Sequence, residues 1–212
     1  MNATTSSADS VIELEELSFV RGGEVILADV SWRMRSGEHW VMLGPNGSGK
    51  STVAACVCGL DWPTTGRVSV LGARYGTVAL RRHRARLGVF QPAPQSGLPV
   101  HHVSATALDV ILTGADGSLA LYREPADADV ARARDLFARY FSASSSLPGG
   151  FPLERRFAAL SSGEQRRVLL LRLFMGRPEL LLLDEPYESL DIPARLDLAA
   201  IVADYIQQQS VP

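Results

Sequence analysis

The sequence predicts an α/β fold, because an apolar strand, a glycine-rich loop and a helix follow one another near the N-terminal third of the chain. Residues 37–43, GEHWVML, are expected to form a buried strand, and residues 52–60, TVAACVCGL, a helix. A second apolar run, LLLLDEP at residues 180–186, is expected to be a further strand of the same type.

The loop between the first strand and its helix carries the strongest motif. GPNGSGKST at residues 44–52 fills every fixed position of the phosphate-binding P-loop pattern GxxxxGK[ST]. Its glycines let the backbone wrap a phosphate chain, and amide groups at the helix N-terminus attract the negative charge. We expect Lys50 to reach the terminal phosphates of a nucleotide triphosphate and Ser51 to bind magnesium. The expected phosphate-binding residues are Gly44, Pro45, Asn46, Gly47, Ser48, Gly49, Lys50, Ser51 and Thr52.

Composition limits the classes of partner. The chain has 212 residues, of which 46% are hydrophobic and 21% charged, enough for one globular domain with an insertion. Its net charge of −2 gives no general attraction to nucleic acid, and no nucleic-acid partner is expected. We interpret the basic cluster RRHRAR at residues 81–86 as a solvated helix face rather than a nucleic-acid site.

Cysteine usage and hydropathy suggest a cytoplasmic protein. Cys56 and Cys58 fall two residues apart in one predicted helix, where their side chains point to different faces and cannot form a disulfide. No apolar run approaches the ~20 residues that span a bilayer, and the polar residues 1–10 are expected to be disordered.

The remaining pattern divides the chain around a helical insertion. Two alternating segments on either side of a turn at residues 21–23 predict antiparallel strands, and residues 66–72 and 87–91 predict further strands. Residues 103–112 and 126–141 are expected to be helical, within an insertion spanning about 92–159. Residues 142–150, SASSSLPGG, are expected to be a flexible connector.

The run LLLLDEP is typical of a fully buried parallel strand that ends at an active site. Asp184 is suited to holding magnesium, because a hard cation prefers oxygen ligands, and Glu185 to polarising an attacking water. The alternative is a core strand that ends in two solvated acids, and the upstream P-loop argues against it.

A third motif, LSSGEQRR at residues 160–167, precedes the apolar VLLLRLFM. Ser161 and Ser162 are suitable helix N-caps, and Gly163 would let a phosphate approach the backbone. An ordinary capped helix explains the same residues equally well.

Together these motifs resemble the ATP-binding cassette family, over residues 11–209. Gln91 matches the family's Q-loop, LSSGEQ its signature, and ESLD at residues 188–191 its D-loop. The resemblance implies a P-loop NTPase (RecA-like) core with an N-terminal antiparallel β subdomain and an inserted helical subdomain, in one ATP-binding domain over residues 11–212.

The resemblance also implies a mechanism that uses ATP and Mg²⁺. Two domains would dimerise head to tail, with Ser161 and Gly163 of one touching the ATP bound by the other, and Asp191 would pass information across the interface. The resemblance assigns catalysis to Glu185, Lys50 and Gln91, and the metal to Ser51, Gln91 and Asp184.

Several positions depart from the family pattern. Arg21 is expected where an aromatic residue normally stacks on adenine, with Phe19 two positions earlier; a planar guanidinium can also stack on a base. Ser162 and Glu164 replace a glycine and a glutamine of the signature. An additional carboxylate near phosphate is mildly unfavourable, and we expect Arg166 and Arg167 to offset it.

The family's switch histidine has no counterpart, since His39, His83, His101 and His102 all lie far upstream of Glu185. The resemblance implies that the missing strand leaves a gap in the sheet with two unpaired apolar edges. We therefore expect the 212 residues to be a truncated product or fragment that keeps the ATP motifs but is impaired in folding or turnover.

Three functions remain open at this stage. The first is the ATPase component of a transporter, bound to a transmembrane permease subunit at the inner face of the membrane. The second is a soluble ATP-switched module of the same family, and the third is an ATP-binding protein without turnover.

Overall fold

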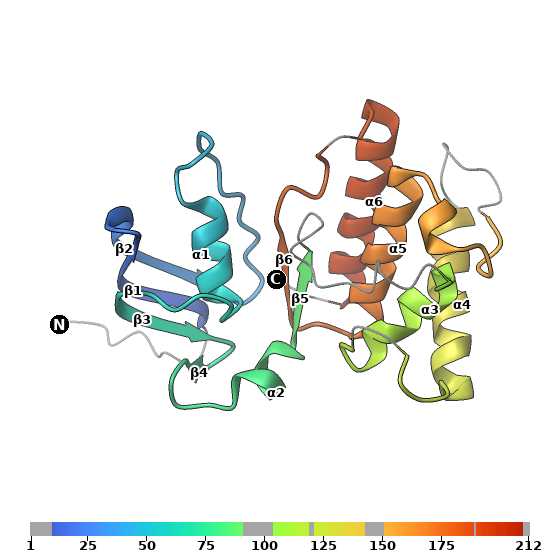
Figure 1. The fold of residues 1–212 in the computed structure, drawn as a ribbon, viewed down its shortest axis with the longest axis horizontal. Helices are drawn as coiled ribbons and strands as arrows, with labels where there is room; N and C mark the ends of the chain where they lie inside the picture. The colour runs from blue at the N-terminus through green and yellow to red at the C-terminus, as the bar shows by residue number, and fades with distance from the viewer. Residues whose placement is uncertain (1–9, 91–103, 119–120, 143–150, 189, 210–212) are drawn as a thin grey trace. The chain divides into compact units, whose positions relative to one another are not determined.

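The computed structural model describes residues 10–90, 104–118, 121–142, 151–188 and 190–209, and these form two compact units (Figure 1). The first unit extends to Leu87 and the second from Gly88 to Gln209. Within the described ranges, no helix combines the length and the apolar character needed to cross a bilayer.

The first unit is built on a four-stranded sheet in the order β2-β1-β3-β4, with every neighbouring pair antiparallel. A tight turn at Gly22 and Gly23, both with positive φ, joins the first two strands as the sequence predicted. The strands are β1 (Ser10–Arg21), β2 (Glu24–Arg35), β3 (Thr65–Val70) and β4 (Ala73–Arg74). Because β1 begins at Ser10, only residues 1–9 of the expected disordered segment lie outside the described residues.

Helix α1 (Lys50–Val57) follows the P-loop as predicted and buries Val53, Cys56 and Val57 in the core of the first unit. Burial is the main cause that raises the pKa of the Cys56 thiol to about 11, so the thiol is protonated at neutral pH. Cys56 and Cys58 are both free, in agreement with the sequence argument against a disulfide.

The basic cluster belongs to helix α2 (Leu80–Arg84) and the turn after it. Arg81 and Arg82 are exposed, while Arg84 donates from Nε to the carbonyl of Cys58 at 3.2 Å and from Nη2 to that of Gly59. Arg84 therefore pairs main-chain carbonyls that the end of α1 leaves without a helical partner.

Residues 37–43 do not form the buried strand that their apolar pattern predicted. They have no strand assignment, and the side chains of Val41 and Leu43 are 79% and 86% exposed. A strand requires a hydrogen-bonded neighbour, and the described sheet of the first unit contains none for this segment. The pattern correctly identifies an apolar segment, but it does not indicate whether a neighbouring strand is present to pair with it.

The second unit consists mainly of helices, with a two-stranded sheet of β5 (Leu87–Phe90) and β6 (Leu180–Leu183) (Figure 1). The sequence predicted helices over 103–112 and 126–141, where the structure has α3 and α4. The helices are α3 (Ala107–Leu112), α4 (Asp127–Ser142), α5 (Ser162–Met175) and α6 (Ile192–Gln209), with 3₁₀ turns η2 (Thr113–Ala115) and η3 (Phe157–Ala159). Of the predicted connector, residues 143–150 lie outside the described residues.

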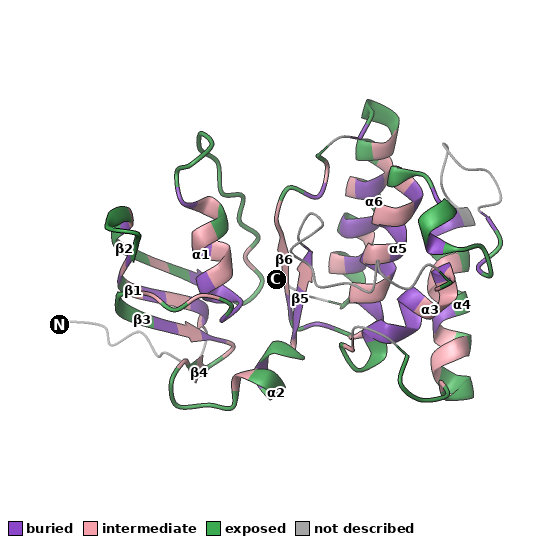
Figure 2. Cartoon of the chain, viewed as in Figure 1, coloured by how far each residue is buried: buried purple, intermediate pink, exposed green. Residues whose placement is uncertain are grey.

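Aromatic packing fixes the helices of the second unit. Phe174 of α5 stacks on Tyr205 of α6 with ring centroids 3.7 Å apart, and Phe141 of α4 meets Phe151 edge to face at 5.1 Å. The buried face of α5 lies at the centre of this packing (Figure 2). Truncating one such ring to alanine typically costs about 3–5 kcal/mol of stability.

The prediction of a fully buried β6 is wrong for three of its four leucines. Leu180 is 1% exposed, whereas residues 181–183 are half-buried. Burial on both faces and edges requires neighbours on each side, and in the described residues only β5 pairs with β6.

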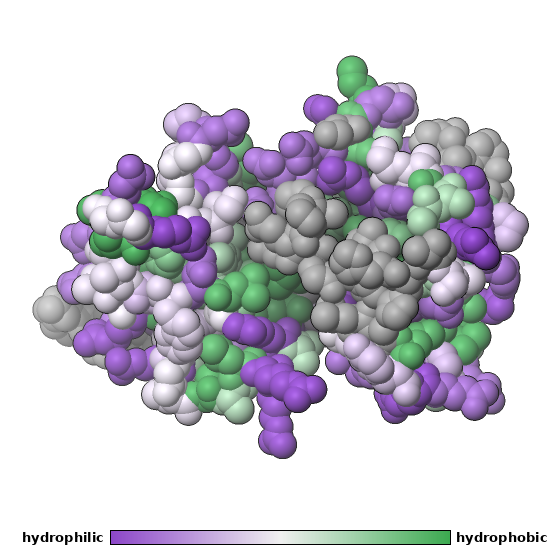
Figure 3. All heavy atoms as spheres, in the orientation of Figure 1, coloured by the Kyte–Doolittle hydropathy of each residue, from purple (hydrophilic) through white to green (hydrophobic). Residues whose placement is uncertain are grey.

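On the face drawn in Figure 3, hydrophilic side chains are spread over both units rather than gathered in one region.

We predict that Gly114→Ala destabilises the second unit. A Cβ atom at this position would lie 1.9 Å from the carbonyl oxygen of Arg172, so the backbone of η2 or α5 must move. Overpacking of this kind typically costs about 1–3 kcal/mol, measurable as a lower midpoint in urea unfolding. Gly163→Ala is the matched control, because its Cβ would meet nothing closer than 3.9 Å. Equal midpoints for the two variants would contradict the prediction.

Candidate functional site

The glycine-rich loop closes around its own lysine. The Lys50 ammonium donates to the carbonyl oxygens of Gly44 and Pro45 at 2.9 and 2.8 Å, and the amide of Ser48 donates to the Pro45 carbonyl at 3.3 Å. Residues 44–48 are exposed, so the loop is open to a ligand from solvent. A cation held over a ring of main-chain groups is suited to meeting a polyanion.

Gly49 seats the loop against the sheet of the first unit. Its φ of +87° belongs to the left-handed region, and a Cβ there would lie 2.6 Å from Cδ2 of Leu27. Gly49 is the N-cap of α1, and no side chain caps this helix. The N-terminus of α1 is therefore suited to binding an anion such as phosphate.

Arg21 lies in the same unit as the loop, and the pairing of β1 with β2 places it close to the loop. Its neighbour Phe19 pairs with Leu27, the residue against which the loop is seated. The Arg21 guanidinium lies over the Phe19 ring at 5.1 Å and forms an ion pair of 2.7 Å with Asp61. With its side chain 60% exposed, Arg21 keeps a planar surface on which a base could stack, as the sequence analysis expects.

In the second unit, the signature segment forms a complete capping box at the start of α5. The Ser161 hydroxyl accepts from the amide of Glu164 at 3.3 Å, and the Glu164 carboxylate accepts from the amide of Ser161 at 2.6 Å. The Glu164 side chain is only 8% exposed and lies 3.6 Å from Nη1 of Arg155. The Ser161 hydroxyl still has its own proton to donate, and the amides of Ser162 and Gly163 begin the helix.

Arg155 also compensates the Glu164 carboxylate, since the two form an ion pair at 3.6 Å. The buried Arg167 pairs with Asp197 of α6 at 2.7 Å. The compensation expected from Arg166 and Arg167 stays a prediction.

The acidic segment begins where the two-stranded sheet ends. The amide of Asp184 donates to the carbonyl of Phe90 at 2.9 Å, continuing the pairing of β6 with β5. The next residue, Glu185, has a φ of +46°, which costs a non-glycine residue about 1–3 kcal/mol. Its carbonyl accepts from the amide of Glu188 at 3.2 Å and from Nη1 of Arg166 at 3.4 Å.

The D-loop residue Asp191 begins helix α6. Its carboxylate accepts from the amide of Ala194 at 2.9 Å, so its described partner is main chain of its own unit. Leu190 approaches Gly163, whose Cβ would lie 3.9 Å from it, and thus the D-loop and the signature segment adjoin one another. Burial raises the pKa of the nearby Tyr187 phenol.

The predicted ligand set fits magnesium in its chemistry, because the hydroxyl of Ser51 and the carboxylate of Asp184 are hard oxygen donors. Ser51 belongs to the first unit and Asp184 to the second. Gln91 lies outside the described residues. In the part of the chain that the structure describes, no three His, Cys, Asp or Glu side chains gather to hold a metal.

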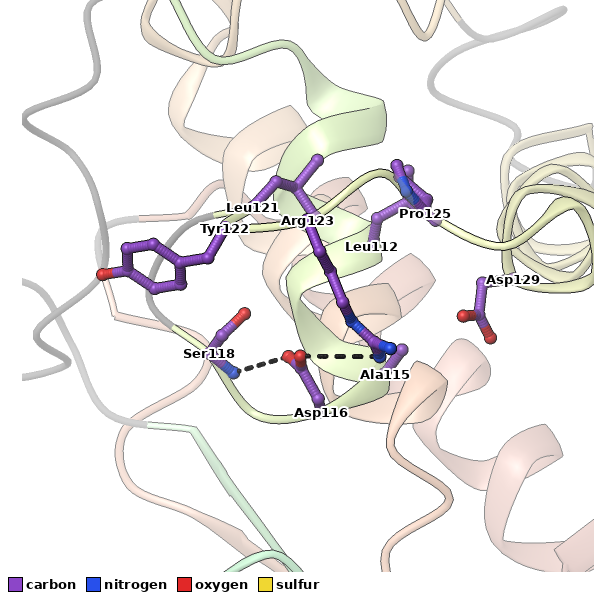
Figure 4. Close-up of a pocket in the computed structure, with 9 residues that line it drawn as sticks. All are labelled: Leu112, Ala115, Asp116, Ser118, Leu121, Tyr122, Arg123, Pro125 and Asp129. Atoms are coloured by element: carbon purple, nitrogen blue, oxygen red, sulfur yellow. Dashed lines mark hydrogen bonds and ion pairs between the residues drawn. The ribbon is translucent and has the colours of Figure 1, made fainter.

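A small open hollow lies in the helical part of the second unit (Figure 4). In it, Asp116 accepts from the Ser118 amide at 3.0 Å and pairs with Arg123 at 3.7 Å. A hydrogen bond to the Ser118 side chain is the main cause that lowers the pKa of Asp116. The walls are formed by Leu112, Ala115, Asp116, Ser118, Leu121, Tyr122, Arg123, Pro125 and Asp129.

Sequence reasoning missed three partners of the motif residues: Asp61 for Arg21, Arg155 for Glu164, and the main chain after Asp184 for Arg166. The pattern Ser-x-x-Glu before an apolar run is typical of a capping box, which predicts that Glu164 bonds to Ser161 but gives no signal for its ion pair with Arg155. The other two contacts join residues distant in sequence, for which a single sequence carries no signal.

The chain is similar to proteins of one family. The family model described as "ABC transporter" matches residues 27–188. An uncharacterized ABC transporter ATP-binding protein of Bacillus subtilis is 32% identical over 203 residues, which cover 95% of this chain and 73% of the relative.

Solved structures agree. The ATP-binding subunit of an ABC transporter superposes with a TM-score of 0.70 and 25% identity, covering 93% of this chain and 75% of the other. A dimeric ATP-binding cassette in a post-hydrolysis state, bound to ADP and Pi, has a TM-score of 0.74 at 21% identity, covering 94% and 85% respectively. These likenesses establish the P-loop NTPase fold with an antiparallel β subdomain and helices.

We predict that Glu164→Gln preserves the stability of the second unit, whereas Glu164→Ala lowers it by about 0.5–2 kcal/mol. Glutamine can still accept from the Ser161 amide, and alanine removes that acceptor. Chemical denaturation of the three proteins tests this. An alanine variant as stable as the wild type would show that the capping box contributes nothing.

Proposed function

Since the chain belongs to the ABC transporter family of ATP-binding proteins, we propose that it is the ATP-hydrolysing subunit of a membrane transporter. The observation that carries this proposal is the glycine-rich loop, with Lys50 held over the carbonyls of Gly44 and Pro45 and an uncapped α1 beside it. These features suit a nucleotide triphosphate, because they combine a cation with the uncapped N-terminus of a helix.

Lys50 would exchange its two carbonyl acceptors for the β- and γ-phosphates, and the amides of α1 would hold the chain of phosphates in line. Glu185 would orient the attacking water and accept its proton, so the chemistry depends on positioning and charge rather than on a covalent intermediate. Mg²⁺, held by Ser51, Asp184 and Gln91, would neutralise charge that develops on the phosphate oxygens.

We further propose that two copies assemble head to tail. The signature segment supports this, because Ser161 keeps a hydroxyl proton, Gly163 is open above its Cα, and both lie at a helix N-terminus suited to an anion. Each ATP would then lie between the loop of one copy and the signature of the other. The similar cassette that is dimeric with ADP and Pi supports the arrangement.

The membrane partner is inferred from the relatives, which are ATP-binding components of ABC transporters. The helical insertion and the region around Gln91 would bind a separate transmembrane permease, with the chain at the inner face of the membrane. Recovery of the protein in a complex with a multi-span membrane protein tests this proposal. Recovery from cytosol without one would favour a soluble ATP-switched module instead.

We predict that Lys50→Ala and Glu185→Gln separate binding from hydrolysis. Removing the ammonium takes away charge-assisted bonds of about 1.5–3 kcal/mol each, so ATP affinity should fall at least about tenfold. Glu185→Gln leaves the phosphate contacts intact and should lower the hydrolysis rate by about 10²–10⁴ with affinity unchanged. Nucleotide titration and phosphate release measure the two effects.

Arg134→Gln is the control variant. Arg134 lies on α4 and forms an exposed ion pair with Glu154, so this variant should match the wild type in both assays. An unchanged rate in Glu185→Gln would refute the assignment of the base. ATP binding by a wild-type protein that releases no phosphate would favour an ATP-binding protein without turnover.

We predict that Gly163→Ala impairs turnover while preserving the fold. The added methyl group meets no described atom closer than 3.9 Å, so unfolding should be unchanged or shifted slightly toward higher stability. A partner's phosphate approaching the helix start would meet that methyl group, and kcat should fall about tenfold or more. Turnover equal to that of the wild type would mean that no phosphate approaches Gly163.

A further inference from the structure

One guanidinium connects the signature helix to the acidic segment. Arg166 lies in the second turn of α5, and its Nη1 atom donates to the carbonyl oxygen of Pro186 at 3.0 Å and to that of Glu185 at 3.4 Å. All three residues belong to the second unit. These contacts make Arg166 a main-chain clamp on the two residues that follow Asp184.

The clamped backbone is the part that most needs support. Glu185 has a φ of +46°, a conformation that non-glycine residues rarely adopt, and the following Pro186 restricts it further. Its carbonyl receives two donors, the Glu188 amide at 3.2 Å and Arg166. Arg166 forms its shorter bond, of 3.0 Å, to the adjacent Pro186 carbonyl, so the guanidinium helps to orient the segment formed by Glu185 and Pro186.

The helix that carries Arg166 is itself held firmly. The capping box closes its first turn, and the Gln165 amide group donates to the carbonyls of Phe157 and Leu160 at 3.1 and 3.2 Å. On the other side, the buried Arg167 pairs with Asp197. Arg166 therefore extends from a helix that several contacts hold in place, and it couples the start of this helix to the Glu185 peptide.

We propose that Arg166 is a positioning residue for hydrolysis, which sets the direction of the Glu185 carboxylate through the main chain. This rests on the proposed function, in which Glu185 acts on the attacking water. Since the signature segment would face the ATP of the partner copy, Arg166 links that contact to the carboxylate serving the copy's own ATP. Within each copy of the proposed dimer, the hydrogen bonds of Arg166 thus connect the segment facing the partner's ATP to the carboxylate at the copy's own ATP.

The test compares Arg166→Gln, Arg166→Lys and Arg172→Gln. Arg172 is the matched control, because it lies on the same helix and its Nη2 also donates to a main-chain carbonyl, that of Ser118 at 3.0 Å. We expect Arg166→Gln to lower kcat about tenfold or more, with KM for ATP, nucleotide affinity and the unfolding midpoint unchanged. Lysine keeps one charged donor and should restore part of kcat.

Arg172→Gln should lower the unfolding midpoint and leave kcat per folded molecule unchanged. Two results overturn the positioning role: a kcat of Arg166→Gln equal to the wild type, or a loss of kcat that only parallels a lower unfolding midpoint or a weaker nucleotide affinity. Both leave the proposed function intact if Glu185→Gln still blocks hydrolysis. If the wild-type protein itself does not hydrolyse ATP, the proposed function fails first.

Discussion

Main-chain groups that regular structure leaves unpaired determine where this protein can act. Helix α1 begins at Gly49 without a side-chain cap, while α5 begins with a capping box of Ser161 and Glu164. The first arrangement leaves amides to be paired by a ligand, and the second satisfies part of them in advance. The two helix starts therefore offer different affinities for an anion, which suits a site whose halves come from one tightly binding and one weakly binding surface.

The same principle governs the acidic segment. After β6 ends, the main chain turns through a strained Glu185, and the carbonyls of Glu185 and Pro186 are paired by Arg166 rather than by another strand. Strain of this kind persists only where the surroundings specify it. A side chain from the signature helix provides that specification, so the positions of two motifs are chemically interdependent within the second unit.

The sequence predicted what depends on local spacing and failed where long-range pairing decides. Helix α1 follows from residues 44–52, and the Ser161 cap from Ser-x-x-Glu, because both are encoded within one turn. Residues 37–43 had the apolar content of a buried strand, but a strand exists only with a neighbour. Likewise, the two adjacent arginines indicated only positive charge. Nothing near them in the sequence indicated that Arg167 would form an ion pair with Asp197 or that Arg166 would donate to the Pro186 carbonyl.

Lys50 donates to the carbonyls of Gly44 and Pro45 within its own loop. On the proposed function, these bonds would order the loop during folding, so less of the binding free energy would be lost when a nucleotide binds. The ammonium would also have to give up two carbonyl partners for the phosphate contacts that it gains. The loop would therefore select by charge density, because a triphosphate can compete with two carbonyls and a weak anion cannot.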